Sequence, residues 1–98
     1  MAFVVAATWK ASPGAEEQVR KVIEVITPLS RAEEKNLFFQ AQVSEDEPGT
    51  FLLYEQYTDA SGYAEHRATA HFQQHVLGEA LPLLAQREVR TFTTVDIA

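Results

Sequence analysis

Apolar side chains recur along the chain with two periods, one typical of strands and one typical of helices. Residues 3–9 (FVVAATW) form a β-branched and aromatic run that ends at the turn-forming sequence KASPG, which predicts a strand. After this turn, the spacing of one buried helix face is kept by Val19, Val22, Ile23, Ile26 and Leu29. Ser12 is a candidate cap for this helix. Pro28 is expected to kink the helix or end it early, because proline removes a backbone hydrogen bond.

Two further runs alternate between apolar and polar residues and predict a β-hairpin. Residues 36–44 form the first strand, one face of which carries Leu37, Phe39, Ala41 and Val43. The acidic sequence EDEPGT (45–50) is the predicted turn, and residues 51–58 return as the partner strand. One face of the partner strand carries Phe51, Leu53, Glu55 and Tyr57. A carboxylate is therefore expected among large apolar side chains in the middle of a strand.

The last third of the chain predicts a helical region and a final strand. Asp59 and Ser61 are candidate caps for a helix over about residues 60–85, and Thr69 would cap a second segment if this helix breaks. Residues 87–98 alternate and are rich in β-branched side chains, so they form the predicted last strand. The order β-α-β-β-α-β predicts an α+β, ferredoxin-like fold: one domain over residues 1–98, with a four-stranded antiparallel sheet and its helices on one face. The other sheet face carries apolar side chains that no helix covers, so we expect a homodimer.

Composition and charge exclude several classes of function. A length of 98 residues, 46% of them hydrophobic, suits one small domain with its own core. A formal charge of −6 counts against nucleic-acid binding, which needs basic residues to neutralise phosphates. The absence of cysteine excludes disulfides and zinc–thiolate sites. The sequence MAFVVAATWK lacks a positive n-region and its apolar run is too short to span a membrane, so we expect a cytoplasmic protein without membrane contact.

All three histidines lie close together, in the sequence YAEHRATAHFQQH (63–75). His71, His75 and Glu79 follow one another at four-residue intervals, which resembles a metal site of two histidines and one carboxylate. Eight residues of straight helix rise about 12 Å, so the outer two of these side chains cannot reach one ion. We therefore expect no metal site, and we expect His75 to be solvated.

His66 and His71 are five residues apart, which corresponds to about 140° of turn in an unbroken helix. The two rings would face one pocket only if the helix breaks near Thr69 or Ala70. The spacing alone leaves two alternatives open: the rings serve a pocket, or they only form hydrogen bonds within the fold.

Glu55 is the other polar residue that needs a partner, because a buried carboxylate is costly without one. One alternative is an ion pair with an arginine, for which the candidates are Arg31, Arg67 and Arg90. The other is a hydrogen bond to a histidine ring, which would fix the tautomer and raise the basicity of the ring. The core or a dimer interface is expected to hold the aromatic residues, some of which would also suit the wall of a pocket for a flat ligand: Trp9, Tyr54, Tyr57, Tyr63 and Phe72.

Four sequence segments, taken together in their order and spacing, resemble the antibiotic biosynthesis monooxygenase domain family. They are KASPGAEEQVRKVI, SRAEEKNLFF, LLYEQYTD and YAEHRATAHF, and the resemblance covers nearly the whole chain. The family implies a dimeric α+β barrel, in which two four-stranded sheets face each other and each protomer has a pocket between sheet and helices. It also implies oxygenation of a phenol, anthrone or hydroquinone by molecular oxygen, with no flavin, haem or metal cofactor.

The resemblance also implies roles for particular residues. His66, His71 and Phe72 match the family pattern H-x-x-x-x-H-F. Glu55 matches the acidic residue of the pattern E-x-W, with Tyr57 in the tryptophan position. The implied proton acceptor is His66 or His71, and the implied orienting partner is Glu55.

A third family pattern, R-x-E-x-G-x at the entrance to the second strand, is matched by Arg31, Glu33 and Asn36. The sequence EEKN replaces the usual proline-glycine turn there, so the shape of this loop departs from the family. The residues expected to contact a small aromatic or quinol-like substrate are Trp9, Asn36, Tyr57, Tyr63 and Phe72.

Three other functions would suit the same fold. Haem degradation is disfavoured, because the first strand holds no asparagine and His66 stands at the tryptophan position of that branch. Isomerisation of a phosphorylated signalling sugar would need a phosphate-binding cluster of basic residues, which we do not identify. A non-catalytic dimeric ligand-binding or stress-associated protein would use the histidines only within the fold. A sealed pocket too small for one aromatic ring would favour this last alternative.

Overall fold

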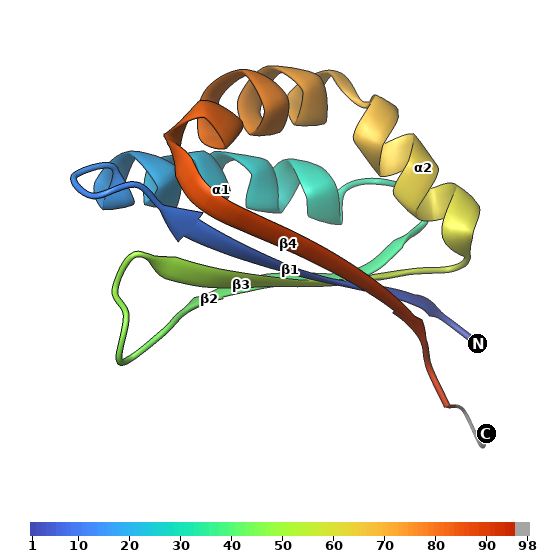
Figure 1. The fold of residues 1–98 in the computed structure, drawn as a ribbon. Coiled ribbons are helices and arrows are strands. Elements are labelled where there is room, and N and C mark those ends of the chain that lie inside the picture. Colours follow the sequence, from blue (N-terminus) through green and yellow to red (C-terminus); the bar gives the residue numbers. More distant parts are fainter. Residues whose placement is uncertain (96–98) are drawn as a thin grey trace.

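The chain forms a four-stranded antiparallel sheet with its helices on one face (Figure 1). The computed structural model describes residues 1–95. The elements along the chain are β1 (Phe3–Ala11), α1 (Glu16–Arg31), β2 (Asn36–Val43), β3 (Thr50–Tyr57), α2 (Ala60–Ala68), η1 (Phe72–Ala80), η2 (Leu81–Leu83) and β4 (Leu84–Thr93). In space the strands follow the order β2-β3-β1-β4. The predicted α+β, ferredoxin-like order β-α-β-β-α-β is confirmed.

The register of the sheet places Glu55 between two buried neighbours. Val5 on β1 lies opposite Glu55 on one side, and Phe39 on β2 lies opposite it on the other. Each of these two neighbours is only 1% exposed. The predicted division of β3 into two faces is confirmed, because Leu53 is buried and Leu52 is exposed.

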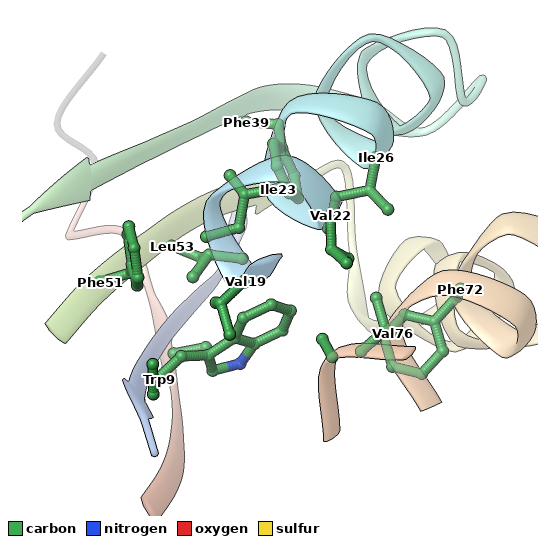
Figure 2. Packing of buried hydrophobic residues seen from close by; sticks show 13 residues of the cluster. Trp9, Val19, Val22, Ile23, Ile26, Phe39, Phe51, Leu53, Phe72 and Val76 are labelled. Carbon is green, nitrogen blue, oxygen red and sulfur yellow. The ribbon is translucent and has the colours of Figure 1, made fainter. Parts of the chain in front are cut away.

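The apolar stripe of α1 packs against the sheet, as the helix period predicts. Figure 2 shows the side chains that point from α1 toward the sheet and η1: Val19, Val22, Ile23 and Ile26. The same hydrophobic cluster contains Trp9, Phe39, Leu53, Phe72 and Val76. Full burial of one such side chain contributes about 1.5–3 kcal/mol, so this cluster is the main force that holds the helices on the sheet.

Both ends of α1 differ from the prediction. Ser12 does not cap the helix, which begins at Glu16 with Ala15 as its N-cap. The Ser12 carbonyl instead accepts a hydrogen bond from the Ala15 amide in the preceding turn. Pro28 does not end the helix early, since its carbonyl accepts a hydrogen bond from the Ala32 amide one turn further on. Proline removes only one hydrogen bond this close to the end, and the packed apolar face outweighs that loss.

Some apolar residues near the ends of elements are more exposed than their pattern suggests. Leu29, predicted for the buried face of α1, is 42% exposed in the last turn of the helix. On the edge strand β2, Leu37 is 56% and Val43 is 40% exposed, whereas Phe39 is buried. The register of β2 against β3 shifts near Leu37, which interrupts the regular alternation of faces.

The helical region breaks at Thr69, which is the condition under which His66 and His71 could face one pocket. α2 ends at Ala68, and the Thr69 backbone is extended, with ψ of 154°. The Thr69 hydroxyl donates to the His66 carbonyl at 2.7 Å and accepts from the Phe72 amide at 3.1 Å, so it caps both segments. The segment that follows, η1, is a π-helix. The break gives His71 an orientation that an unbroken helix would not allow.

The last strand begins earlier than predicted. β4 covers Leu84–Thr93, whereas the alternation pattern predicted residues 87–98. Residues 96–98 of that prediction lie outside the described part of the chain. Within residues 1–95, the helices are all too short or too polar to cross a membrane.

Candidate functional site

His66 and His71 converge on one carboxylate, that of Glu33. His66 lies on α2, His71 lies directly before η1, and Glu33 lies in the loop between α1 and β2. Oε2 of Glu33 is 2.8 Å from Nδ1 of His66 and 2.7 Å from Nε2 of His71. The exposed fractions of the side chains are 12% for Glu33, 3% for His66 and 17% for His71. The structure therefore brings the predicted histidine pair together, through a carboxylate from a distant segment.

The hydrogen bond to Glu33 assigns the two nitrogens of the His66 ring. A carboxylate only accepts, so Nδ1 of His66 is the donor, and in a neutral ring Nε2 then carries the lone pair. Nε2 lies 3.8 Å from Oε1 of Glu55. The His66 ring is thus placed between two carboxyl groups, one hydrogen-bonded to it and one at ion-pair distance.

Glu55 is 4% exposed, and the Tyr57 hydroxyl donates to its Oε1 at 2.6 Å. Burial raises the pKa of the Glu55 carboxyl, and this effect exceeds the opposite influences of His66 and of the Tyr57 hydrogen bond. Burial, together with the nearby Glu55, also raises the pKa of the Tyr57 hydroxyl, which therefore remains a donor. The Tyr57 side chain is 0% exposed and supports Glu55 from within the core.

The three arginines considered as partners for Glu55 are engaged elsewhere in the described chain. Arg31 donates through Nε to a backbone carbonyl of β2 at 2.8 Å. Arg67 lies over the ring of Tyr63, 4.6 Å from its centroid. Arg90 lies 3.9 Å from a glutamate on its own strand. Of the two alternatives for Glu55, the structure thus favours the contact with histidine, although its 3.8 Å separation exceeds a hydrogen bond.

A small cavity lies between the sheet and the helices, beside His66. Its volume is about 10 Å³, which is close to the space that one water molecule needs. The predicted site residues that line it are Trp9, Glu55, Tyr63, His66 and Phe72. The cavity has no room for an aromatic ring as it stands, which is the observation expected for the non-catalytic alternative.

Trp9, which lines this cavity, has an unused hydrogen-bond donor. The indole is 3% exposed, and its Nε1 has no hydrogen-bond partner among residues 1–95. A buried donor without a partner costs about 1–3 kcal/mol. An acceptor atom of a bound molecule would remove that cost.

Three predicted site residues lie outside the cavity. The Asn36 side-chain amide donates to the Phe38 carbonyl at 3.3 Å, at the start of β2. The Tyr57 hydroxyl donates to Glu55, which lines the cavity. His71 contacts Glu33, which in turn contacts the cavity residue His66. These positions give Asn36 no contact with the cavity and give the other two residues an indirect connection to it.

His75 takes no part in this cluster. Its Nδ1 lies 2.9 Å from Oε1 of Glu79, one helical turn away, and its side chain is 20% exposed. His71 instead binds Glu33, so His71, His75 and Glu79 do not form one site. The expectation that His75 is solvated holds only in part, because the side chain is mostly covered and contacts Glu79.

Two residues of the site had no role predicted from the sequence: Arg87, and Glu33, which matches the family pattern R-x-E-x-G-x. Glu33 stands in the segment SRAEEKNLFF but is 33 and 38 residues from the two histidines, so no local period connects them. Arg87 lies opposite Trp9 in the sheet, lines the cavity, and opposes the rise in the pKa of Glu55 through its charge. The alternation along β4 could have found Arg87. The contact of Glu33 with the histidines depends on the path of the loop between α1 and β2.

This arrangement can perform acid–base chemistry. One nitrogen of His66 is held by a carboxylate and the other lies beside a mostly apolar cavity, so the ring can accept a proton from a bound hydroxyl group. The ring of Phe72 packs edge-on against His66 at 5.0 Å, and that of Tyr63 stacks on it at 6.1 Å. These aromatic contacts fix the orientation of the imidazole and keep bulk water away from it.

Comparison with known proteins agrees with this architecture. The sequence profile described as antibiotic biosynthesis monooxygenase matches residues 2–76 of the chain. The structure of Rv0793 from Mycobacterium tuberculosis is similar, with a TM-score of 0.91 and 23% identity, and the match covers 100% of this chain and 99% of that one. No curated protein sequence matches the chain significantly.

Two further solved structures have the same fold. A crystal structure described as an antibiotic biosynthesis monooxygenase has a TM-score of 0.89 and 24% identity, and the match covers 96% of this chain and 99% of that one. A conserved protein of unknown function from Bacteroides thetaiotaomicron, described as a possible oxidoreductase, has a TM-score of 0.88 and 22% identity, with coverage of 95% and 97%. At these identities the similarity shows a shared fold.

Proposed function

Because the chain belongs to the antibiotic biosynthesis monooxygenase family, whose profile matches residues 2–76, we propose that it oxygenates a quinol, phenol or polyketide-type aromatic with molecular oxygen. One observation carries the proposal. The hydrogen bond from His66 to Glu33 leaves Nε2 of the ring as a proton acceptor beside Glu55, and both residues line the cavity. His66 is therefore our choice for the proton acceptor, ahead of His71.

In the proposed reaction, His66 removes the proton of a phenolic hydroxyl, and the resulting electron-rich anion reduces oxygen. One oxygen atom forms a new bond to a ring carbon, the O–O bond breaks, and the other oxygen atom leaves as water. A hydroquinone plus O₂ thus gives a hydroxyquinone plus water, with O₂ as the oxidant. The unpartnered Nε1–H of Trp9 is available to donate to the developing anion.

Glu33 takes the orienting role that the family resemblance implied for Glu55. The distance of 2.8 Å to Nδ1 of His66 is that of a direct hydrogen bond, whereas Glu55 is 3.8 Å from Nε2. A carboxylate on the far side of a histidine base selects the tautomer and stabilises the imidazolium that forms. In this proposal Glu55 acts as a polar group of the cavity wall.

An aromatic substrate requires the cavity to widen. A cavity of about 150 Å³ can hold benzene, whereas this one has a volume of about 10 Å³. Tyr63 is partly exposed and Arg87 is exposed, and both side chains line the cavity beside the edge strand β4. Rotation of these two side chains toward solvent would enlarge the space without disturbing the hydrophobic cluster.

The small volume favours a second candidate, a non-catalytic dimeric ligand-binding or stress-associated protein in which the histidines serve only the fold. An isomerase of a phosphorylated signalling sugar has less support. Arg87 is the one cationic side chain among the described residues that line the cavity, and its charge acts on Glu55. A phosphate group needs several donors or cations.

The test is oxygen uptake on a panel of hydroquinones and anthrones, with EDTA present. We expect His66→Gln to lower kcat by at least about 100-fold, the usual contribution of general acid–base catalysis. Glu33→Gln keeps the size of the side chain but weakens the orienting interaction, so it should lower kcat as well. His75→Ala is the matched control and should leave the rate unchanged, because His75 pairs with Glu79 away from the cavity.

Binding can be followed separately from turnover, because Trp9 is the only tryptophan of the chain and lines the cavity. Saturable quenching of its fluorescence by an aromatic compound that is not oxidised would support the second candidate. An undiminished rate in His66→Gln, or no oxygen uptake on any compound of the panel, would overturn the first.

A further inference from the structure

Glu33, His66 and His71 form a group of three potential metal ligands at the end of the helical layer. One nitrogen of each histidine and an oxygen of Glu33 all lie within 4.8 Å of one another. In the hydrogen-bonded form, both nitrogens lie within 2.8 Å of the same atom, Oε2 of Glu33. Two imidazole nitrogens and a carboxylate are a ligand set that zinc and related divalent ions bind.

The carboxylate of Glu33 has an oxygen that the fold does not use. Its Oε1 is buried and has no hydrogen-bond partner within residues 1–95. A buried acceptor without a partner is costly, particularly on a charged group. A cation bound to Oε2 and the two rings would neutralise the charge of this carboxylate and so lower the cost of its unpartnered oxygen.

The second ring nitrogen of His66 lies near a carboxyl group, that of Glu55. Histidine ligands commonly direct their second ring nitrogen at a carboxylate or carbonyl, which orients the ring. Nε2 of His66 lies 3.8 Å from Glu55, which is itself held by the Tyr57 hydroxyl at 2.6 Å. With a metal on Nδ1, the proton on Nε2 would be directed toward Glu55 across this 3.8 Å gap, which is longer than a hydrogen bond.

We propose that Glu33, His66 and His71 bind a divalent transition-metal ion of the zinc class, with one coordination position left for water. Ligand atoms about 2.0–2.1 Å from a tetrahedral zinc ion lie about 3.3 Å apart. The present separations of 2.7 and 2.8 Å need to increase by roughly half an ångström, which side-chain rotation can supply. Glu33 and His71 are 12% and 17% exposed, so the ion can enter from solvent at their side.

No spacing pattern along the chain predicts this site. Helix geometry argues against a cluster of His71, His75 and Glu79, and in the structure His71 contacts Glu33 whereas His75 contacts Glu79. The third ligand in the proposal is Glu33, from the loop before β2. Only the packing of that loop against the break at Thr69 brings it to the two rings.

The ion would also control the proposed oxygenation, and this part of the inference rests on the proposed function. A metal at Nδ1 of His66 leaves the proton of a neutral ring on Nε2. Nε2 then has no lone pair with which to remove a phenolic proton. Zinc should therefore inhibit oxygen uptake, and EDTA should restore it.

Metal binding is tested first on EDTA-treated, dialysed protein, without any substrate. Titration with Zn²⁺ against a chromophoric chelator should give one ion per chain. His71→Ala should weaken binding by at least about tenfold, and Glu33→Gln should do the same. His75→Ala is the matched control and should keep the affinity, because it removes a histidine whose carboxylate partner is Glu79.

Circular dichroism is the check that each variant is folded. The partly exposed His71 is the histidine ligand whose removal should disturb the core least. Absence of stoichiometric binding, equal affinity in His71→Ala, or loss of affinity in His75→Ala would overturn the site. Zinc binding without any oxygen uptake would leave the site standing and contradict the proposed function. If zinc binds but does not inhibit oxygen uptake, the proposed control of oxygenation by the ion would be contradicted.

Discussion

The polar residues of the site form a buried chain that runs from Tyr57 through Glu55 and His66 to Glu33. Its ends are hydrogen bonds of 2.6 Å from Tyr57 to Glu55 and of 2.8 Å from His66 to Glu33. In the middle, Glu55 and His66 are 3.8 Å apart. Because a buried polar group needs a hydrogen-bond partner, the Tyr57 hydroxyl lowers the free-energy cost of burying Glu55 within the strand. We therefore expect Tyr57 to support the site instead of contacting a substrate.

Replacement of Tyr57 by phenylalanine tests this role. The change removes the donor from a carboxyl group that is 4% exposed, so the free energy of unfolding should fall by about 1–3 kcal/mol. Urea denaturation measures the loss. Tyr54→Phe is the control on the outer face of the same strand, where the hydroxyl accepts from Gln56 at 3.0 Å, and it should cost less than about 0.5 kcal/mol. Equal losses in the two variants would contradict a special role for Tyr57.

At the level of secondary structure, α2 is a nine-residue helix whose position against the sheet determines where His66 lies. Asp59 caps its start, since its carboxylate accepts from the Ser61 amide at 2.9 Å, and Thr69 terminates it. Between them, Gly62 lies against the end of β3 with almost no free space. The helix is too short to be stable alone, so tertiary packing has to hold it.

Replacement of Gly62 by alanine should show how tightly α2 is placed. A Cβ atom there would lie 2.8 Å from Cβ of Tyr57 and 3.0 Å from Cβ of Lys35. Overpacking costs about 1–3 kcal/mol, which exceeds the gain of up to about 1 kcal/mol in helix propensity. The midpoint of urea unfolding should therefore fall. Gly78→Ala on η1 is the control: its Cβ would approach only the Gln73 carbonyl oxygen, at 3.5 Å, so stability should stay equal or rise. A gain in stability in both variants would contradict the tight contact.

For the whole molecule, the uncovered face of the sheet is the feature that calls for a partner. Figure 1 shows the helices on one side of the sheet only. The apolar residues on the other side include Phe38, Leu52 and Phe92, which are 43%, 42% and 46% exposed. Their positions on three different strands make this a broad surface that crosses the sheet. A second copy of the chain is the occupant we predict.

Sedimentation at micromolar concentration tests this dimer. The unaltered protein should sediment as a dimer, and Leu52→Glu should shift it to the monomer, because a two-fold contact would bury the new charge in both copies. Val25→Glu is the matched control. Val25 is 45% exposed, close to the 42% of Leu52, but lies on α1 on the opposite side of the sheet, so this variant should remain dimeric. A monomeric wild type would contradict the prediction.

Features with a local signal could be predicted from the sequence. The faces of β3 follow from strict alternation, and the packing of α1 follows from the helix period. Thr69 could be named only as the cap of a second segment if the helix breaks, because its capping hydrogen bonds lie within three residues. The predictions for Ser12 and Leu29 were wrong, because the tertiary structure outweighed the local sequence preference there. Ser12 has a side chain suited to capping, but it lies in a turn that precedes the start of the helix. Leu29 follows the helix period, but it lies in the last turn of α1 and is 42% exposed.

The candidate site divides in the same way. His66 and His71 could be named as a candidate pair from the sequence, because they lie close together along the chain. Whether the two rings face one another depends on the helix break between them. Three features could not be predicted from the sequence. They are Glu33 as the shared partner of the histidines, Arg87 as a wall of the cavity, and a cavity volume of about 10 Å³. These features depend on how a loop, an edge strand and two helical segments pack in space, at separations of tens of residues. Over such separations no periodic pattern of side chains carries information, and packing alone sets the distances.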